Sequence, residues 1–256
     1  MKKIPIGWIT TPALVIAFVV AWDAYVSIFQ VSKFILPPPR AVAESFIDLM
    51  TDPVSMRHAW ITLYETLAGF AIATVVGIGL GTALGKTAWL EQALNPFIIA
   101  TQVVPKVALV PLFILWFGFG PEAKIVVAAV LAFFPILTNT ILGIKSVDRG
   151  HRDVMTVMNA TRLQRFVALE FPSALPAILA GMEVGVVLSI IGAVVGEYLG
   201  GSTGLGHLAV AALNDYKVGA MFAVILLLTL MGFVLYVLVG LLKYLLIPWH
   251  ESVQRP

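Results

Sequence analysis

Charged side chains inside long apolar stretches are the residues of this sequence that could do chemistry. An isolated charge at the centre of a bilayer costs about 2.5–3.5 kcal/mol on insertion scales, so it needs a partner or a water-filled cavity. Lys106 and Glu183 are the deepest such residues. Glu197, Glu65 and Asp23 are expected near the outer ends of their stretches, where solvent reaches them.

Two arrangements of Lys106 and Glu183 stay open at this point. They lie beside a translocation path, where they could pair with each other, or each belongs to a structural ion pair elsewhere. Their depths differ by roughly 10 Å at a rise of about 1.5 Å per residue, which weakens direct pairing. Gln102, Asn139 and Glu197 are further candidate residues of the path.

No set of residues predicts catalysis. The four histidines, at positions 58, 151, 207 and 250, have no metal-ligand spacing, and the chain contains no cysteine. A glycine-rich phosphate loop followed by Lys and Ser or Thr is also absent, so the chain is not expected to bind ATP. We expect a non-catalytic protein that holds no cofactor or metal and binds no nucleic acid.

The composition is that of a membrane protein. The chain is 60% hydrophobic and 12% charged, whereas soluble domains carry about 25% charged residues. Helices are the elements that satisfy their own backbone groups in lipid, and about 20 residues cross the hydrocarbon layer. We predict an all-α polytopic membrane protein, one domain over residues 1–256, with six spans. The apolar blocks lie near Gly7–Phe29, Thr62–Gly85, Leu90–Phe117, Glu122–Ile144, Ser173–Leu199 and Gly219–Ile247.

Lysine and arginine predict the orientation. Ten of them, including Lys2, Lys3 and Arg255, fall on one side of the predicted membrane and four on the other. Basic loops stay cytoplasmic, so both termini and the arginine-rich loop after the fourth span should face the cytoplasm.

That arginine-rich loop has the pattern of a short helix–turn–helix. Asn159 and Ala160 separate two apolar stripes, and Asn tolerates the left-handed conformation of a turn. Thr161 can cap the second helix, and Pro172 should end it by pushing Phe171 out of helical geometry. Membrane-surface binding and docking to a cytoplasmic partner both fit this pattern. The stripes are Val154, Val157, Met158 and Leu163, Phe166, Val167, with Arg162 and Arg165 off the apolar face.

Several features predict how the spans pack. Glycines recur on one face of the second and fifth spans, which lets neighbouring backbones approach closely. Pro105 and Pro111 should kink or break the third span, and Pro135 should kink the fourth. The loop Gly200–Gly206 should be flexible and external, as part of an outer lid or as a plain turn.

The arginine-rich loop resembles the EAA loop of permease subunits in ATP-binding-cassette importers, in its spacing more than in its residues. The E-A-A slots fall on Asp153, Val154 and Met155, and the glycine slot falls on Asn159. The closing I-x-L-P slots fall on Leu169 and Phe171-Pro172. Other stretches resemble the nitrate, sulfonate and taurine branch: "ILPPPRAVAESF", "VVPKVALVPLFILWFGFGPEAKI" and "GEYLGGSTGLGHL".

The resemblance implies a function and its partners. The chain would be the permease of a type I importer in a bacterial inner membrane, with a five-helix core at about 60–247 preceded by one helix. Residues 146–172, with Asp153–Met155, Asn159–Arg162, Arg165, Leu169 and Pro172, would couple it to a cytoplasmic ATPase that binds ATP and Mg. A periplasmic binding protein would deliver a small solute, often an anion such as a sulfonate, taurine or nitrate. Relatives with similar spans resemble transporters of pyrimidine vitamin precursors, so a neutral solute stays open. A second copy would complete the pore within the lipid.

Two other functions compete with this one. A secondary transporter or channel would use Lys106 and Glu183 in ion coupling, but it predicts an internal repeat that the sequence lacks. A membrane-embedded enzyme would need a nucleophile–base set, and none is evident.

Overall fold

The computed structural model describes residues 7–249, with side chains from Thr10 onward. Lys2, Lys3, His250 and Arg255 therefore lie outside the described residues. Eleven α-helices and two short helical segments make up this part of the chain, which contains no strand. The prediction of an all-α protein is confirmed.

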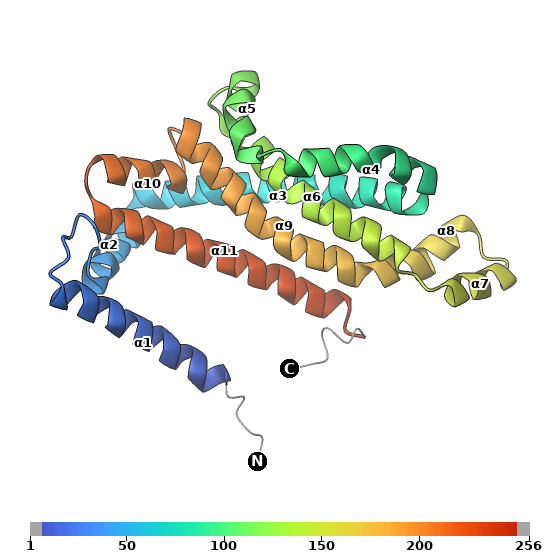
Figure 1. Ribbon diagram of the computed structural model, residues 1–256, viewed down its shortest axis with the longest axis horizontal. Helices are drawn as coiled ribbons and strands as arrows, with labels where there is room; N and C mark the ends of the chain where they lie inside the picture. The colour runs from blue at the N-terminus through green and yellow to red at the C-terminus, as the bar shows by residue number, and fades with distance from the viewer. Residues whose placement is uncertain (1–6, 250–256) are drawn as a thin grey trace, which may run out of the picture.

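Five helices are long and apolar enough to cross a membrane, and they match five of the predicted blocks (Figure 1). Four of the five reach beyond those blocks at one or both ends by one to nine residues, so the sequence placed the spans correctly but underestimated the length of three of them. They are α1 (Gly7–Ile28), α3 (Pro53–Lys86), α6 (Pro121–Lys145), α9 (Phe171–Gly200) and α11 (Val218–Leu246).

The third predicted span is broken. It consists of α4 (Ala88–Val103), the 3-10 segment η1 (Lys106–Leu109) and α5 (Val110–Phe117), with a bend of 85° between its two parts. Pro105 sits at the break, which confirms its predicted effect. Pro111 lies in the first turn of α5, where backbone N–H groups have no partner within the helix, so the N–H that proline lacks costs no hydrogen bond. Counting the bent pair as one span gives the predicted six.

Helix α6 lies at the centre of the bundle between α3 and α9. Gly69 of α3 and Gly192 of α9 both face Ala128, where a Cβ on either glycine would come within 2.5 Å and 2.7 Å of its Cβ and Cα. The predicted glycine faces are therefore sites of close helix packing. Other glycines that face α6 are Gly77, Gly81 and Gly85 of α3, and Gly181, Gly185 and Gly196 of α9.

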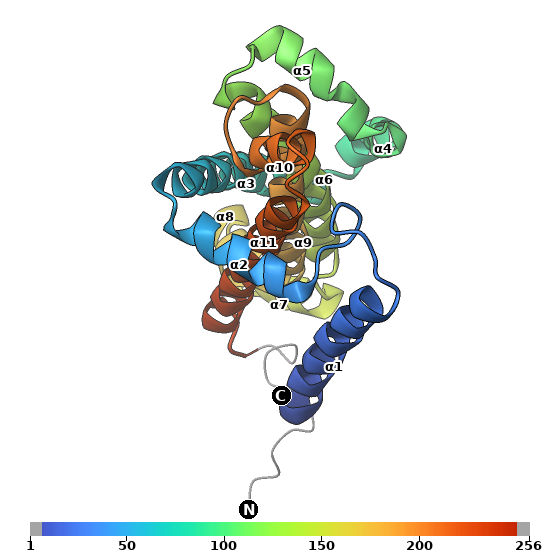
Figure 2. The same cartoon turned by 90° about the vertical axis from the view of Figure 1, so that its left-hand side faces the viewer.

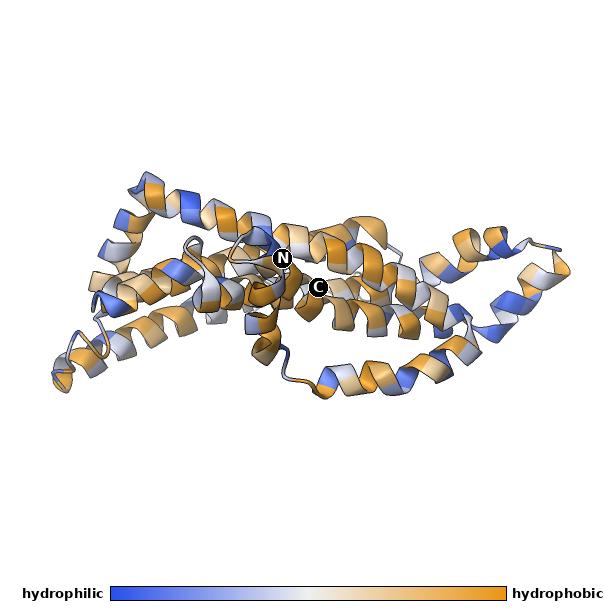
Figure 3. Ribbon diagram, turned by 90° about the horizontal axis from the view of Figure 1, so that it is seen from above, coloured by the Kyte–Doolittle hydropathy of each residue, from blue (hydrophilic) through white to orange (hydrophobic). Residues whose placement is uncertain are grey.

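The two ends of the bundle carry different short helices. At one end, α2 (Pro39–Thr51) and α10 (Leu205–Asn214) pack beside the start of α3 and α11. At the other end, α7 (Arg149–Val157) and α8 (Arg162–Arg165) project as a hairpin (Figure 1). Hydrophilic residues gather along α7, while apolar residues dominate the long helices (Figure 3). The sequence predicted the hairpin but not α2 or α10.

Helix α1 stands apart from the bundle. Figure 2 shows it leaving the α2 end and running away from the other spans. Its side chains are exposed almost all round, apart from contacts such as that between the rings of Trp22 and Phe222, 6.1 Å apart. A helix that is apolar on every face is suited to contact with lipid.

Candidate functional site

The α7–α8 hairpin, defined as residues 149–170 so that it includes the π-helical turn Phe166–Glu170 after α8, forms largely from the local signals that its sequence contains. Asp148 caps α7 by accepting the N–H groups of Gly150 and His151 at 2.7 and 3.3 Å. Asn159 takes the left-handed conformation, with φ 52°, and so makes the predicted turn. Thr161 caps α8 as predicted, because its hydroxyl accepts the Gln164 N–H at 3.2 Å while the Gln164 side chain accepts the Thr161 N–H at 2.9 Å.

The prediction that Pro172 ends the second helix is wrong. Helix continues from Arg162 to Gly200, and Phe171 keeps helical dihedral angles. A π-turn over Phe166–Glu170 explains this, since the Phe171 N–H bonds to the carbonyl of Phe166 five residues back. Pro172 then falls in the first turn of α9, where its missing donor is tolerated.

The apolar residues of the hairpin face away from the protein. Val157 is 82% exposed and Leu163 is 70% exposed, and Val154, Met158 and Val167 are exposed as well. Phe166 is the exception, because it packs against Ile144, Ala174 and Ile178. Exposed apolar side chains on a projecting, capped hairpin indicate a contact surface for something outside this chain.

Polar contacts fasten the hairpin to two of the central helices. The Arg152 guanidinium donates to the carbonyl of Ile144 at the end of α6, at 3.0 Å. Lys86, at the end of α3, forms an ion pair with Glu170 at 2.8 Å and lies 4.4 Å from the centre of the Phe166 ring. The hairpin therefore contacts the ends of both α3 and α6.

The residues predicted from the sequence to couple the chain to an ATPase lie on this hairpin and its continuation into α9. Asp153, Val154, Thr161 and Arg162 are exposed there, while Met155, Ala160, Arg165, Leu169 and Pro172 are half-buried. The sequence analysis did not single out Lys86 and Glu170, whose ion pair joins this segment to α3. Their signal was present, because each is a charge at the end of an apolar block on the same predicted side.

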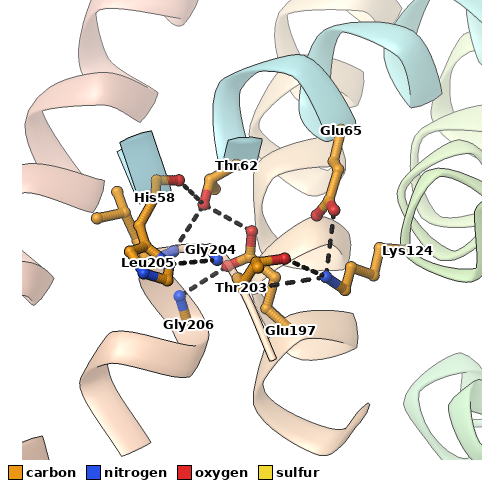
Figure 4. A network of polar contacts seen from close by, with 9 residues as sticks. All are labelled: His58, Thr62, Glu65, Lys124, Glu197, Thr203, Gly204, Leu205 and Gly206. Carbon is orange, nitrogen blue, oxygen red and sulfur yellow. Dashed lines mark hydrogen bonds and ion pairs between the residues drawn. The ribbon is translucent and has the colours of Figure 1, made fainter. Parts of the chain in front are cut away.

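A buried polar cluster lies at the opposite end of the bundle (Figure 4). Three successive backbone N–H groups at the start of α10 donate to side chains of α3 and α9. Gly204 donates to His58 Nδ1 at 2.8 Å, Leu205 to the Thr62 hydroxyl at 2.8 Å, and Gly206 to Glu197 at 2.7 Å. These bonds satisfy the orphan donors of a helix N-terminus and fix the loop before it.

Ionic contacts complete the polar cluster, which we define as His58, Thr62, Glu65, Lys124 and Glu197. Thr62 donates to Glu197 at 2.6 Å. Lys124 lies 3.3 Å from the Glu65 carboxylate and donates to the carbonyl and hydroxyl of Thr203 at 3.4 and 3.3 Å.

Two predictions about this end are wrong. Glu65 and Glu197 are 0% and 1% exposed rather than solvated, because partners from other helices cover them. The loop Gly200–Gly206 is held by the polar cluster rather than free. Gly204 takes φ +102°, and a Cβ there would overlap the Glu197 carboxylate.

Lys106 and Glu183 do not pair with each other. Glu183 forms an ion pair with Lys243 of α11, at 3.4 Å, which matches the alternative of a structural pair. The Lys106 ammonium lies 4.8 Å from the centre of the Phe134 ring and 3.4 Å from the Gln102 carbonyl. Asn139 donates to the Pro135 carbonyl at 2.8 Å and packs beside Gly181.

A cavity of about 410 Å³ brings together two of the predicted pathway residues, Gln102 and Lys106. Asn139, Glu183 and Glu197 do not line it. Its other walls are Val107, Leu131, Phe134, Pro135, Thr138 and Leu188. Within the described residues, no group of three or more His, Cys, Asp or Glu side chains is placed to hold a metal ion.

Comparison with known proteins assigns the family. Residues 73–249 match the family described as the binding-protein-dependent transport system inner membrane component. The chain belongs to this family. It is 39% identical to a riboflavin transport system permease protein of Chloroflexus aurantiacus, over 94% of this chain and 90% of that protein. It is 32% identical to a putative aliphatic sulfonates transport permease protein of Bacillus subtilis, over 97% of this chain and 90% of that protein.

A solved structure supports the fold. The MetNI methionine ABC transporter, in inward-facing conformations, contains a chain that aligns with a TM-score of 0.66 and 20% identity. The alignment covers 75% of this chain and 96% of that one. The fold is thus that of a type I permease, and the family resemblance seen in the sequence is confirmed. The chain is a non-catalytic permease subunit of an ABC importer for a small solute in an inner membrane.

Proposed function

We propose that this permease carries a small anion across the membrane, driven by a separate cytoplasmic ATPase that docks on the α7–α8 hairpin. Both termini and the hairpin face the cytoplasm in this proposal, and ATP and Mg are held by the ATPase. A periplasmic binding protein delivers the solute at the α2–α10 end, and a second copy of the chain completes the pore.

The observation that carries the proposal is the exposed apolar surface of the hairpin. Val157, Met158 and Leu163 project from a structured, capped element at one end of the bundle. Contact residues of this kind lose water when a partner covers them, which is the main favourable term in association. Asp153, Met155 and Leu169 lie on the same hairpin at the spacing of the EAA motif, although Asp and Met replace the Glu and Ala of that motif.

Force can pass from this surface into the spans through two short routes. One is the bond between Arg152 and the last turn of α6, and the other is the ion pair between Glu170 and Lys86 of α3. Because α6 packs closely against α3 and α9, movement of the hairpin would be transmitted to the centre of the bundle.

The solute class rests on the cavity and on the relatives. Lys106 gives the cavity a positive charge. Relatives are named as permeases for aliphatic sulfonates and nitrate, which are anions, and for taurine, a zwitterion with a sulfonate group. Those named for riboflavin and formylaminopyrimidine take uncharged solutes, so the charge of the cavity decides between the classes. An anion is the class that a positively charged cavity selects.

Docking can be tested by placing a charge on the apolar surface. We expect Val157→Asp and Leu163→Asp to weaken ATPase binding by roughly tenfold or more, since apolar contact residues at an interface centre dominate its affinity. Arg149→Gln is the control, because Arg149 is exposed at the start of α7 and lies off the apolar stripe. The measurement is the amount of ATPase that co-purifies with each variant from membranes in which the wild-type complex forms.

Folding must be followed in parallel. Each variant should elute as the wild-type permease does in size-exclusion chromatography. Full retention of the ATPase by both aspartate variants would show that the hairpin is not the docking surface.

A further inference from the structure

We propose that the cavity at the break between α4 and α5 is a binding site in the permease for an organic anion, a negatively charged group on an apolar body. The proposal deepens the proposed function, because it names the solute class and the residues that contact it. Lys106 binds the charged group, and the apolar wall receives the rest of the solute.

The charge of Lys106 is not compensated within the described chain. The other described lysines of the long helices, Lys86, Lys124, Lys145 and Lys243, each form an ion pair with a glutamate. Lys106 has no carboxylate within 4.0 Å among the described residues; its ammonium contacts only a backbone carbonyl and the face of Phe134. An aromatic face orients a cation without cancelling its charge.

The break in the helix at this cavity also indicates that the cavity has a function. Non-helical backbone at membrane depth is tolerated where it lines a cavity or is packed in protein. The 85° break at Val104 and Pro105 places Lys106 at the wall of this one. On α6, Leu131, Phe134 and Thr138 line the cavity at helical spacing, while the opposite face, with Ile136 and Thr140, packs against glycines of α3 and α9.

The size and walls of the cavity select the solute. Its volume of about 410 Å³ lies in the range of about 300–1,000 Å³ that is usual for small-molecule sites. A bare inorganic oxyanion would leave most of it filled with water, against the side chains of Val107, Leu131 and Leu188. Gln102 and Thr138 add uncharged polar groups, and no carboxylate lines the wall to repel an anion.

The absence of cysteine allows a direct test in the ATPase-bound transporter. A single Thr138→Cys places one thiol in the cavity wall, and Gln102→Cys provides a second position. The rates of modification are measured with two methanethiosulfonate reagents, one ending in a sulfonate and one in a trimethylammonium group. We expect the sulfonate reagent to be favoured, and Lys106→Met to lower the ratio of the two rates roughly tenfold. Lys33→Met is the control, because Lys33 is exposed in the loop between α1 and α2 and also forms no ion pair with any residue that the structure describes.

Protection experiments identify the ligand. Benzenesulfonate should slow modification in vesicles of neutral phosphatidylcholine, and it should lose this effect in Lys106→Met. Nitrate and the neutral benzenesulfonamide should protect at least tenfold more weakly.

Four results would overturn the assignment. They are an unchanged rate ratio in Lys106→Met, equal protection by nitrate, protection that appears only when anionic phosphatidylglycerol is present, and no reaction at either thiol. The third would make a lipid headgroup the ligand of Lys106. None of the four bears on ATPase docking, which is measured separately on the hairpin.

Discussion

The two ends of this permease differ in whether their side chains find partners within the chain. At the α10 end, backbone donors and buried charges find partners inside the chain, through Thr62, Lys124 and Glu197. At the hairpin end, apolar side chains such as Val157 are left uncovered. Groups matched within a chain indicate a structural task, and groups left unmatched on an ordered element indicate a partner.

The same contrast separates two lysines of the transmembrane region. Lys124 is 3% exposed and faces Glu65 and Thr203. Lys106 is half-buried at the wall of a cavity and faces no carboxylate among the described residues. The charge of Lys124 is neutralised within the fold, whereas no carboxylate of the described residues neutralises that of Lys106.

The largest effect is expected from breaking the ion pair of the polar cluster. Lys124→Met leaves the fully buried Glu65 without its cation, and removal of one partner of a buried pair destabilises by about 3–5 kcal/mol. The double variant Lys124→Met/Glu65→Gln should recover much of this loss. Thermal unfolding of the purified complex measures both. Equal midpoints for the single variant and the wild type would mean that this end is not held as described.

A smaller effect is expected from the loop that the polar cluster holds. Gly204→Ala places a Cβ against the Glu197 carboxylate, at φ 102° and ψ 168°, a conformation that is almost exclusive to glycine and by itself costs about 1–3 kcal/mol. Gly118→Ala is the matched control, because Gly118 also has a positive φ, of 80°, but has no atom within 4 Å of its Cβ position. Gly204→Ala should therefore lower the unfolding temperature more than Gly118→Ala. A larger drop in unfolding temperature for Gly118→Ala than for Gly204→Ala would contradict a loop that is tightly held by the polar cluster.

The smallest change in stability is expected at the ion pair that joins the hairpin to α3. Lys86 is 35% exposed along its side chain, so solvent screens the pair, and Glu170→Gln should cost about 1 kcal/mol or less. Its effect should appear instead in coupling, as ATP hydrolysis that continues with reduced solute uptake. Glu91→Gln, which breaks the ion pair between α4 and Lys145, serves as the control. Unchanged uptake per ATP hydrolysed in Glu170→Gln would exclude this route of transmission.

The sequence predicted what depends on neighbours along the chain. Asn159, Thr161 and Pro105 act within one turn, so their conformations followed from residue type. The spans followed from apolar length. The prediction for Pro172 was wrong because a π-turn just before it lets the helix continue although proline has no backbone N–H. No local sequence pattern predicted this π-turn.

Contacts between distant segments were not predictable in the same way. Thr62 and Glu197 lie 135 positions apart, and their pairing depends on how α3 and α9 pack around α6. Each appeared alone as a polar residue near the end of a span, where solvent is the ordinary partner. The polar cluster therefore became visible only with the fold.

The most direct test of the account is the accessibility of one thiol at each end. Single Val157→Cys and Leu213→Cys variants of this cysteine-free chain place a thiol on the hairpin and at the end of α10. A membrane-impermeant thiol reagent applied to intact cells should label Leu213→Cys alone. In inside-out vesicles it should label Val157→Cys, and bound ATPase should protect that thiol. Labelling of Val157→Cys from outside the cell, or labelling that the ATPase does not slow, would contradict the assignment of the hairpin as the cytoplasmic docking surface.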